Sequence, residues 1–178
     1  MTRVDKITGV GYYGSNTIFS DFADTDGDGT GTKNAIGNYA GGQEIFYIQP
    51  PTGVVYRVHR MLVSYEDAAG MQAQEYGNTG AALTNGIQIR IQNDTETLSD
   101  ITDGVPIKTN AHWGRMCYDV DVKTWGSGDE LLCARWTFAK SGAAIVLDGS
   151  RNERLEILLN DSFVGLISQY FLIQGNIV

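Results

Sequence analysis

Hydrophobic and polar residues alternate with a period of two through most of the chain after residue 43. In the segment 86–92, Ile87, Ile89 and Ile91 alternate with polar residues directly after an Asn-Gly turn signal. Such alternation is typical of a strand that buries one face, and no segment keeps helical spacing over the roughly 11 residues that a helix prediction needs. About eight to ten such strands, separated by turn signals, predict an all-β fold, an antiparallel β-sandwich or jelly roll.

Two alternating runs on either side of the sequence WGSGD predict a central hairpin. Folding it about Ser127 pairs Tyr118 with Trp136, Asp119 with Arg135, and Val120 with Ala134. Apolar residues then face apolar residues and opposite charges face each other, as cross-strand pairing favours. In this register Cys117 lies beside Thr137 and Cys133 beside Asp121, too far apart along the ladder for a disulfide.

The segment 54–65 predicts a strand whose buried face changes partway along. The apolar positions carry even numbers up to Val58 and odd numbers from Met61 onward. Such a change requires a β-bulge or a crossing between two sheets, and we expect one of these near Arg60. The following segment, 66–83, breaks the alternation and predicts a short helix or a long loop.

The first 42 residues differ from the rest of the chain. They contain nine glycines, and no three large apolar residues fall close enough together to form a core. Fixing a glycine-rich chain costs much conformational entropy, so order here requires contact with the chain's own domain or a neighbouring subunit. We predict an extended N-terminal arm over residues 1–42 and one β-sandwich domain over residues 43–178. The expected anchors of the arm on another protein are Ile18, Phe19, Phe22 and Tyr39.

Composition narrows the classes of partner. The net charge is −8 and Lys and Arg form no cluster, which argues against a face for nucleic acid. The longest apolar stretch is far shorter than the roughly 20 residues of a membrane span, and the N-terminus lacks the apolar core of a signal peptide. Charged residues make up only 19% of the chain, below the roughly 25% typical of soluble domains. We therefore expect a surface partly covered by other proteins.

One segment resembles a metal site. Asp24, Asp26, Asp28 and Gly29 reproduce the opening of a calcium-binding loop, in which alternate carboxylates converge on one cation. The acid expected at the twelfth position of the loop is replaced by Ala35. Calcium is therefore the one candidate cofactor, and an acidic, solvated loop is the alternative interpretation.

Catalytic patterns are absent from the sequence. Of the two histidines, we place His112 in a loop. Neither His59 nor His112 has a second metal ligand at metal-binding spacing. No nucleophile motif and no nucleotide-binding motif occurs. Pairs of carboxylates are as typical of solvated strand edges as of a glycosidase. Trp113 and Trp125 lie beside glycines in predicted loops, where they could stack on sugars or fix the loop to the core, whereas Trp136 is expected in the core.

Four stretches carry a resemblance to a known family: IFYIQPPTGVVYRVHRMLVSYEDA, LTNGIQIRIQND, ITDGVPIKTNAHWGRMCYDVDVKTWGSGDELLCARWTFAKSG and LDGSRNERLEILLNDSFVGLISQYFLIQG. They resemble small virion structural proteins of tailed bacteriophages over residues 43–178. The resemblance rests on the general character of these stretches, because that family has no catalytic or ligand motif to transfer. It implies a capsid cement or decoration protein, or a component of the head, neck or tail.

These expectations combine into a functional hypothesis. The chain would be made in the host cytoplasm and carried in the virion, where it would contact the major capsid protein or other virion proteins. Closed symmetry, expected as a homotrimer, would let each arm or C-terminal strand cover the edge of the next subunit. The alternative is a head fibre or a carbohydrate-binding spike module that uses Trp113 or Trp125, with an enzyme as the third class.

Overall fold

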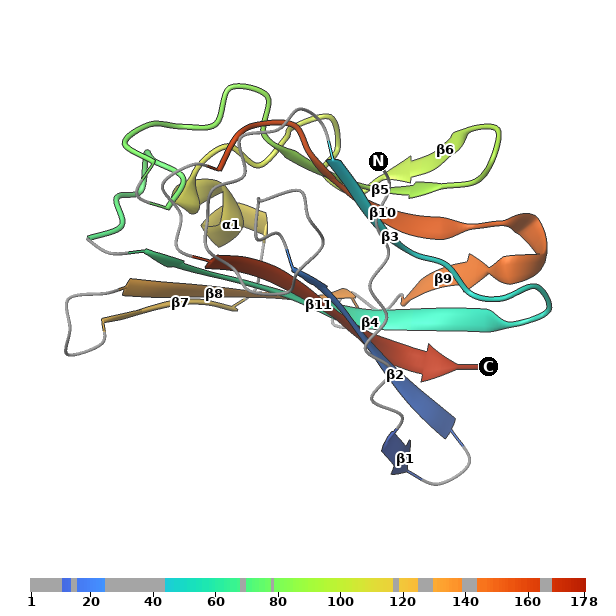
Figure 1. Cartoon of the computed structure of the whole chain (residues 1–178). Coiled ribbons are helices and arrows are strands. Elements are labelled where there is room, and N and C mark those ends of the chain that lie inside the picture. Colours follow the sequence, from blue (N-terminus) through green and yellow to red (C-terminus); the bar gives the residue numbers. More distant parts are fainter. Residues whose placement is uncertain are drawn as a thin grey trace.

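The chain folds into two antiparallel β-sheets that pack face to face (Figure 1). This computed structural model describes residues 11–13, 16–24, 44–67, 70–77, 79–116, 119–124, 130–138, 144–163 and 168–178. The predicted all-β sandwich is therefore confirmed. No helix within these ranges is long and apolar enough to cross a membrane.

Among the described residues, the larger sheet has seven strands and the smaller sheet has four. The order in the large sheet is β1 (Gly11–Tyr13), β2 (Asn16–Asp24), β11 (Ser168–Ile177), β4 (Val55–Asp67), β8 (Glu130–Thr137) and β7 (Asp119–Thr124), and β9 (Ile145–Asp148) also pairs with β4. The order in the small sheet is β3 (Glu44–Ile48), β10 (Arg154–Leu159), β5 (Ile87–Gln92) and β6 (Thr97–Asp100). A helix, α1 (Asn110–Met116), and a 3-10 turn, η2 (Gly149–Arg151), complete the described elements.

The central hairpin has the register predicted from its alternation. In the β7–β8 pair, Asp119 lies opposite Arg135, Val120 opposite Ala134, and Asp121 opposite Cys133. Cys133 is a free thiol, while Cys117 and Tyr118 lie outside the described residues. Pairing by charge and polarity was therefore enough to set this register.

A β-bulge at His59 explains the change of face in β4. Arg60 lies opposite Gln174 of β11, but Val58 lies opposite the adjacent residue, Gly175. One residue of β4 is thus left over, which confirms the bulge expected near Arg60. The other edge of β4 changes partner at the same point, because it pairs with β9 up to Val58 and with β8 from Arg60 onward.

The hydrophobic core lies between the two sheets. Ile87 and Ile89 of β5 are fully buried, and Ile91 packs against the core, as the alternation predicted. Ile157 of β10 lies opposite Ile89 and is 1% exposed, while Phe171 of β11 contributes from the large sheet. Burial of these side chains fixes which face of each strand points outward.

Of two regions that lie between strands, one forms a loop and the other forms a helix. The described part of the segment 66–83 beyond β4 forms turns and loop rather than a helix. Residues 110–116, expected as a loop, form α1 instead, and the Thr109 hydroxyl accepts a hydrogen bond from the His112 N–H at 3.3 Å. A helix of two turns is too short to show helical periodicity, which is why the pattern missed it.

Part of the predicted arm joins the domain. Strand β2 pairs with β11 from Thr17 opposite Ile177 to Asp24 opposite Tyr170, and β1 pairs with β2. Residues 16–24 thus form a strand of the chain's own large sheet, which differs from an arm lying wholly on foreign protein. Backbone hydrogen bonds to β11 hold this part of the predicted arm, whose own composition provides no hydrophobic core.

Candidate functional site: a charged network on the four-stranded sheet

The outer face of the small sheet carries a network of charged side chains. On β10, Leu155 and Ile157 point into the core, so Arg154 and Glu156 point away from it. Arg90 of β5 lies directly opposite Glu156 and shares that face. The strand register therefore places opposite charges side by side, as cross-strand pairs favour.

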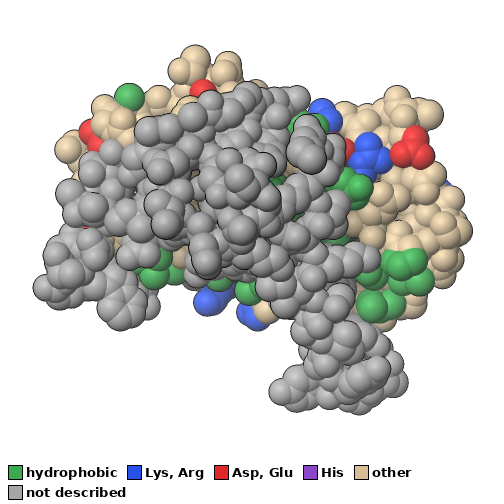
Figure 2. Space-filling view, in the orientation of Figure 1, with side chains coloured by type: hydrophobic (Ala, Val, Ile, Leu, Met, Phe, Trp, Pro, Cys, Tyr) green, Lys and Arg blue, Asp and Glu red, His purple; other side chains and the backbone are tan. Residues whose placement is uncertain are grey.

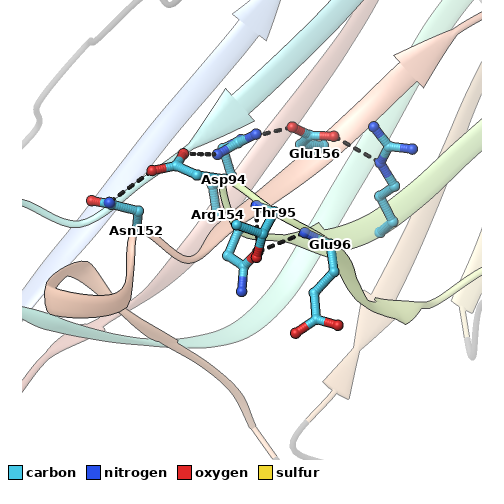
Figure 3. A network of polar contacts seen from close by, with 8 residues as sticks. Asp94, Thr95, Glu96, Asn152, Arg154 and Glu156 are labelled. Atoms are coloured by element: carbon cyan, nitrogen blue, oxygen red, sulfur yellow. Dashed lines mark hydrogen bonds and ion pairs between the residues drawn. The ribbon is translucent and has the colours of Figure 1, made fainter.

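Glu156 is the centre of this network (Figure 3). One carboxylate oxygen accepts from Arg90 Nε at 2.8 Å, and the other accepts from Arg154 Nε at 2.7 Å. Although it lies on the outer face, Glu156 is only 3% exposed. Both of its oxygens thus have a charged donor, as a buried carboxylate requires.

Asp94 extends the network from the β5–β6 loop. Its carboxylate accepts from Arg154 Nη1 at 3.1 Å and from Asn152 Nδ2 at 2.8 Å. Asn93 shapes this loop, because its side-chain oxygen accepts from the Thr95 N–H at 2.8 Å. Asn152 caps η2 with a φ of 54°, a left-handed conformation that asparagine tolerates better than most residues.

Arg154 also lies over an aromatic ring. Its guanidinium carbon is 5.9 Å from the centre of the Tyr47 ring on β3, within the range of a cation–π contact. Burial alone would lower the pKa of Arg154, but hydrogen bonds and the charges of Glu156 and Asp94 outweigh burial and raise it. The guanidinium therefore stays charged.

The chemistry of the network is that of paired charges. Two cations balance two anions, and both oxygens of Glu156 are engaged, so this carboxylate is not free to take a proton from a substrate. Basic and acidic side chains also lie next to each other at the upper right of the space-filling view, over the small sheet (Figure 2). A charge-balanced face with a flat arginine and tyrosine suits a protein partner better than a polyanion.

The candidate calcium residues are only partly placed. Asp24 ends β2 opposite Tyr170, and Asp26 and Asp28 lie outside the described residues. Within the described ranges, no three His, Cys, Asp or Glu side chains come together as metal ligands would. The calcium site therefore stays a prediction from the sequence.

Trp113 has a different role from the one considered for sugar binding. It is fully buried in α1 and packs against Phe171, with ring centroids 6.4 Å apart. A buried indole offers no face to a carbohydrate, so of the two roles considered for Trp113 the structure confirms the one that fixes its segment to the core. Trp125 lies outside the described residues, and Trp136 packs against the core as expected.

Trp113 belongs to a buried polar cluster beneath the loop that follows β4. Tyr76 stacks on Tyr65 at 5.0 Å and donates a hydrogen bond to Gln169 at 2.8 Å, while Tyr65 donates to Asn110. Burial raises the pKa of Tyr76 far above its ordinary value and outweighs the opposing effect of the nearby Trp113 indole. The Tyr76 hydroxyl stays neutral, and the hydrogen bonds of Tyr76 and Tyr65 fix the loop on the sheet.

Both histidines have structural hydrogen bonds. His59 Nε2 bonds the Asn176 side-chain oxygen at the bulge. His112 Nδ1 accepts from the Lys108 N–H at 2.9 Å, which assigns its ring proton to Nε2. These contacts give both histidines structural roles.

The predicted interface residues fall mostly on β2. Ile18, Phe19 and Phe22 lie in register with Asn176, Gly175 and Leu172 of β11. Tyr39 lies outside the described residues. The three residues on β2 therefore pair with β11 of the same chain, and their role as anchors on another protein stays a prediction.

Sequence reasoning missed the charged network. The signal was present, because inward isoleucines in β5 and inward Leu155 and Ile157 in β10 leave Arg90, Arg154 and Glu156 on the other face. What was missing was the pairing of β5 with β10, which are more than 60 residues apart in the sequence. No protein-family model matches the chain, and no curated protein matches it.

Proposed function

We propose that this chain is a virion structural protein of a tailed bacteriophage, a capsid cement or decoration protein that acts by contact and catalyses no reaction. The sequence resemblance over residues 43–178 supports this proposal, and so does the low fraction of charged residues. A decoration protein must add buried contacts to a shell, and a rigid sandwich with attachable edges suits that task.

One structural observation carries the proposal. A glycine-rich leading segment contributes β2, and β2 holds to the domain by strand pairing along the edge of β11. Attachment of a strand to a sheet edge is a general mode of protein association, because the backbone supplies the hydrogen bonds and few specific side chains are needed. The leading segment therefore has the means to bind an exposed sheet edge.

The major capsid protein or another virion protein is the proposed partner. The charge-balanced outer face of the small sheet, with Arg154 packed over Tyr47, supplies a second surface suited to protein contact. A head fibre, neck or tail component would use the same features. Burial of Trp113 counts against a carbohydrate-binding spike.

Purified particles from a phage that encodes the chain provide the test. The chain is expected to co-purify with mature heads, and particles that lack it are expected to release DNA at a lower temperature. Adding back the purified protein should restore the release temperature, whereas an equal amount of an unrelated β-sandwich protein should not. A chain that stays free in the lysate, or whose loss leaves the release temperature unchanged, would contradict the proposal.

A further inference from the structure

The hairpin formed by β1 and β2 is attached to the molecule along one edge. Among the described elements, β2 has substantial contact only with β11 and β1, and β1 only with β2. Figure 1 shows the hairpin projecting past the C-terminus, away from the small sheet. Within the described part of the chain, pairing with β11 therefore carries the attachment of the hairpin to the large sheet.

A long connection leads from the hairpin to the sandwich. Residues 25–43 join the end of β2 in the large sheet to β3 in the small sheet, and they include six glycines. A segment of this length can span up to roughly 60 Å when extended. A connection of that length allows the hairpin of one copy to reach the β11 edge of another.

We propose that two copies of this chain exchange their β1–β2 hairpins, so that each hairpin pairs with β11 of the other copy. The exchanged contact is the one already present, from Thr17 opposite Ile177 to Asp24 opposite Tyr170, and is therefore complementary without any new surface. Exchange also leaves no sheet edge of β11 open in either copy. The partner is thus a second copy of the same chain.

Concentration decides between the closed and exchanged forms. A connection of this length presents the hairpin to its own β11 at an effective concentration of the order of 1 mM. In dilute solution the closed form therefore dominates, whereas copies crowded on a surface reach comparable local concentrations. Such crowding would apply to the proposed role on a capsid, but the exchange itself does not depend on that role.

Cysteine pairs across β2 and β11 test the exchange in the full-length protein. Ser20 lies opposite Gln174, so the disulfide Ser20→Cys to Gln174→Cys matches the register. All variants carry Cys117→Ser and Cys133→Ser. A single chain with both cysteines should close its own disulfide at about 10 µM, which checks the register itself.

A mixture of chains that carry only Ser20→Cys with chains that carry only Gln174→Cys can be linked only between copies. After equilibration and mild oxidation, we expect about 1% covalent heterodimer at about 10 µM and a large fraction at about 1 mM. The matched control replaces Gln174→Cys by Glu96→Cys, an exposed site beside β6 in the other sheet. Heterodimer at the control level at about 1 mM, or a double variant that fails to close its own disulfide, would overturn the inference.

Discussion

A Cβ atom on Gly149 would lie 2.0 Å from the carbonyl oxygen of Pro51. This contact seats the β3–β4 turn on η2, where the Gly149 N–H donates to the Val54 carbonyl at 3.0 Å. The Gly53 N–H donates in turn to the Ser150 hydroxyl at 3.1 Å. The backbones of the β3–β4 turn and of η2 therefore lie in contact at Gly149, and only glycine leaves room for that approach.

Gly149→Ala is expected to destabilise the protein by at least about 2 kcal/mol, because the obstructing atoms are backbone and cannot rotate away. Urea unfolding followed by tryptophan fluorescence measures this change. The matched control is Gly114→Ala, at an exposed position of α1 with no atom within 4 Å of the new Cβ. That control should stabilise the protein by about 0.5–1 kcal/mol, and equal effects of the two changes would contradict the contact.

Asp161→Asn is expected to cost about 1–3 kcal/mol. The Asp161 carboxylate accepts from three consecutive backbone N–H groups, those of Thr84 and Asn85 at 3.0 Å and that of Gly86. An amide in its place points an NH2 group at these donors and loses charge-assisted bonds. Thermal unfolding at pH 7 checks this, with Asp103→Asn as a control at an exposed residue whose φ of 50° asparagine accommodates. A similar loss of stability in both variants would show that the hydrogen bonds from the three backbone N–H groups to Asp161 are not the cause.

Local patterns predicted the features whose causes are local. The pairing of Asp119 with Arg135 followed from alternation and charge, and the bulge at His59 followed from a change in the parity of apolar residues. Each depends on residues within one strand or one hairpin. The physical cause was therefore visible in a short window of sequence.

Features that depend on distant pairing were not predicted. Glu156 acquires its role only when β5 lies beside β10, and Trp113 becomes buried only when α1 packs against β11. The place of β2 beside β11 joins opposite ends of the chain. Periodicity defines which face of a strand is buried, but not which strand lies next to it.

Glu156→Gln is expected to destabilise the protein by about 2 kcal/mol. The substitution leaves Arg90 and Arg154 facing each other without the shared anion, and the side chain of Glu156 is 4% exposed. The side chains of Arg90 and Arg154 are 30% and 20% exposed, so water screens their charges and reduces the loss of stability. Urea unfolding measures the loss.

Glu96→Gln, at an exposed site, is the control for that change and should fall within about 0.5 kcal/mol of the parent. Combining Glu156→Gln with Arg90→Met should recover part of the loss, because one of the two unpaired cations is removed. Strict additivity of the two substitutions would show that Arg90 and Glu156 do not interact.

Tyr76 makes stability fall at high pH. Burial raises its pKa in the folded protein far above the value of about 10 in the unfolded chain. The stabilising effect of the neutral hydroxyl is thus complete below pH 10 and is lost as pH rises, because only the unfolded chain releases the proton. Above pH 10, the free energy of unfolding of the parent should therefore fall by up to about 1.4 kcal/mol per pH unit more than that of Tyr76→Phe.

Near pH 7 the Tyr76→Phe variant should be less stable than the parent by about 1 kcal/mol, since Gln169 loses a hydrogen bond of 2.8 Å. Urea titrations at pH 7, 10 and 11 measure both quantities, and parallel pH dependences would show that the Tyr76 hydroxyl ionises in the folded protein as readily as in the unfolded one.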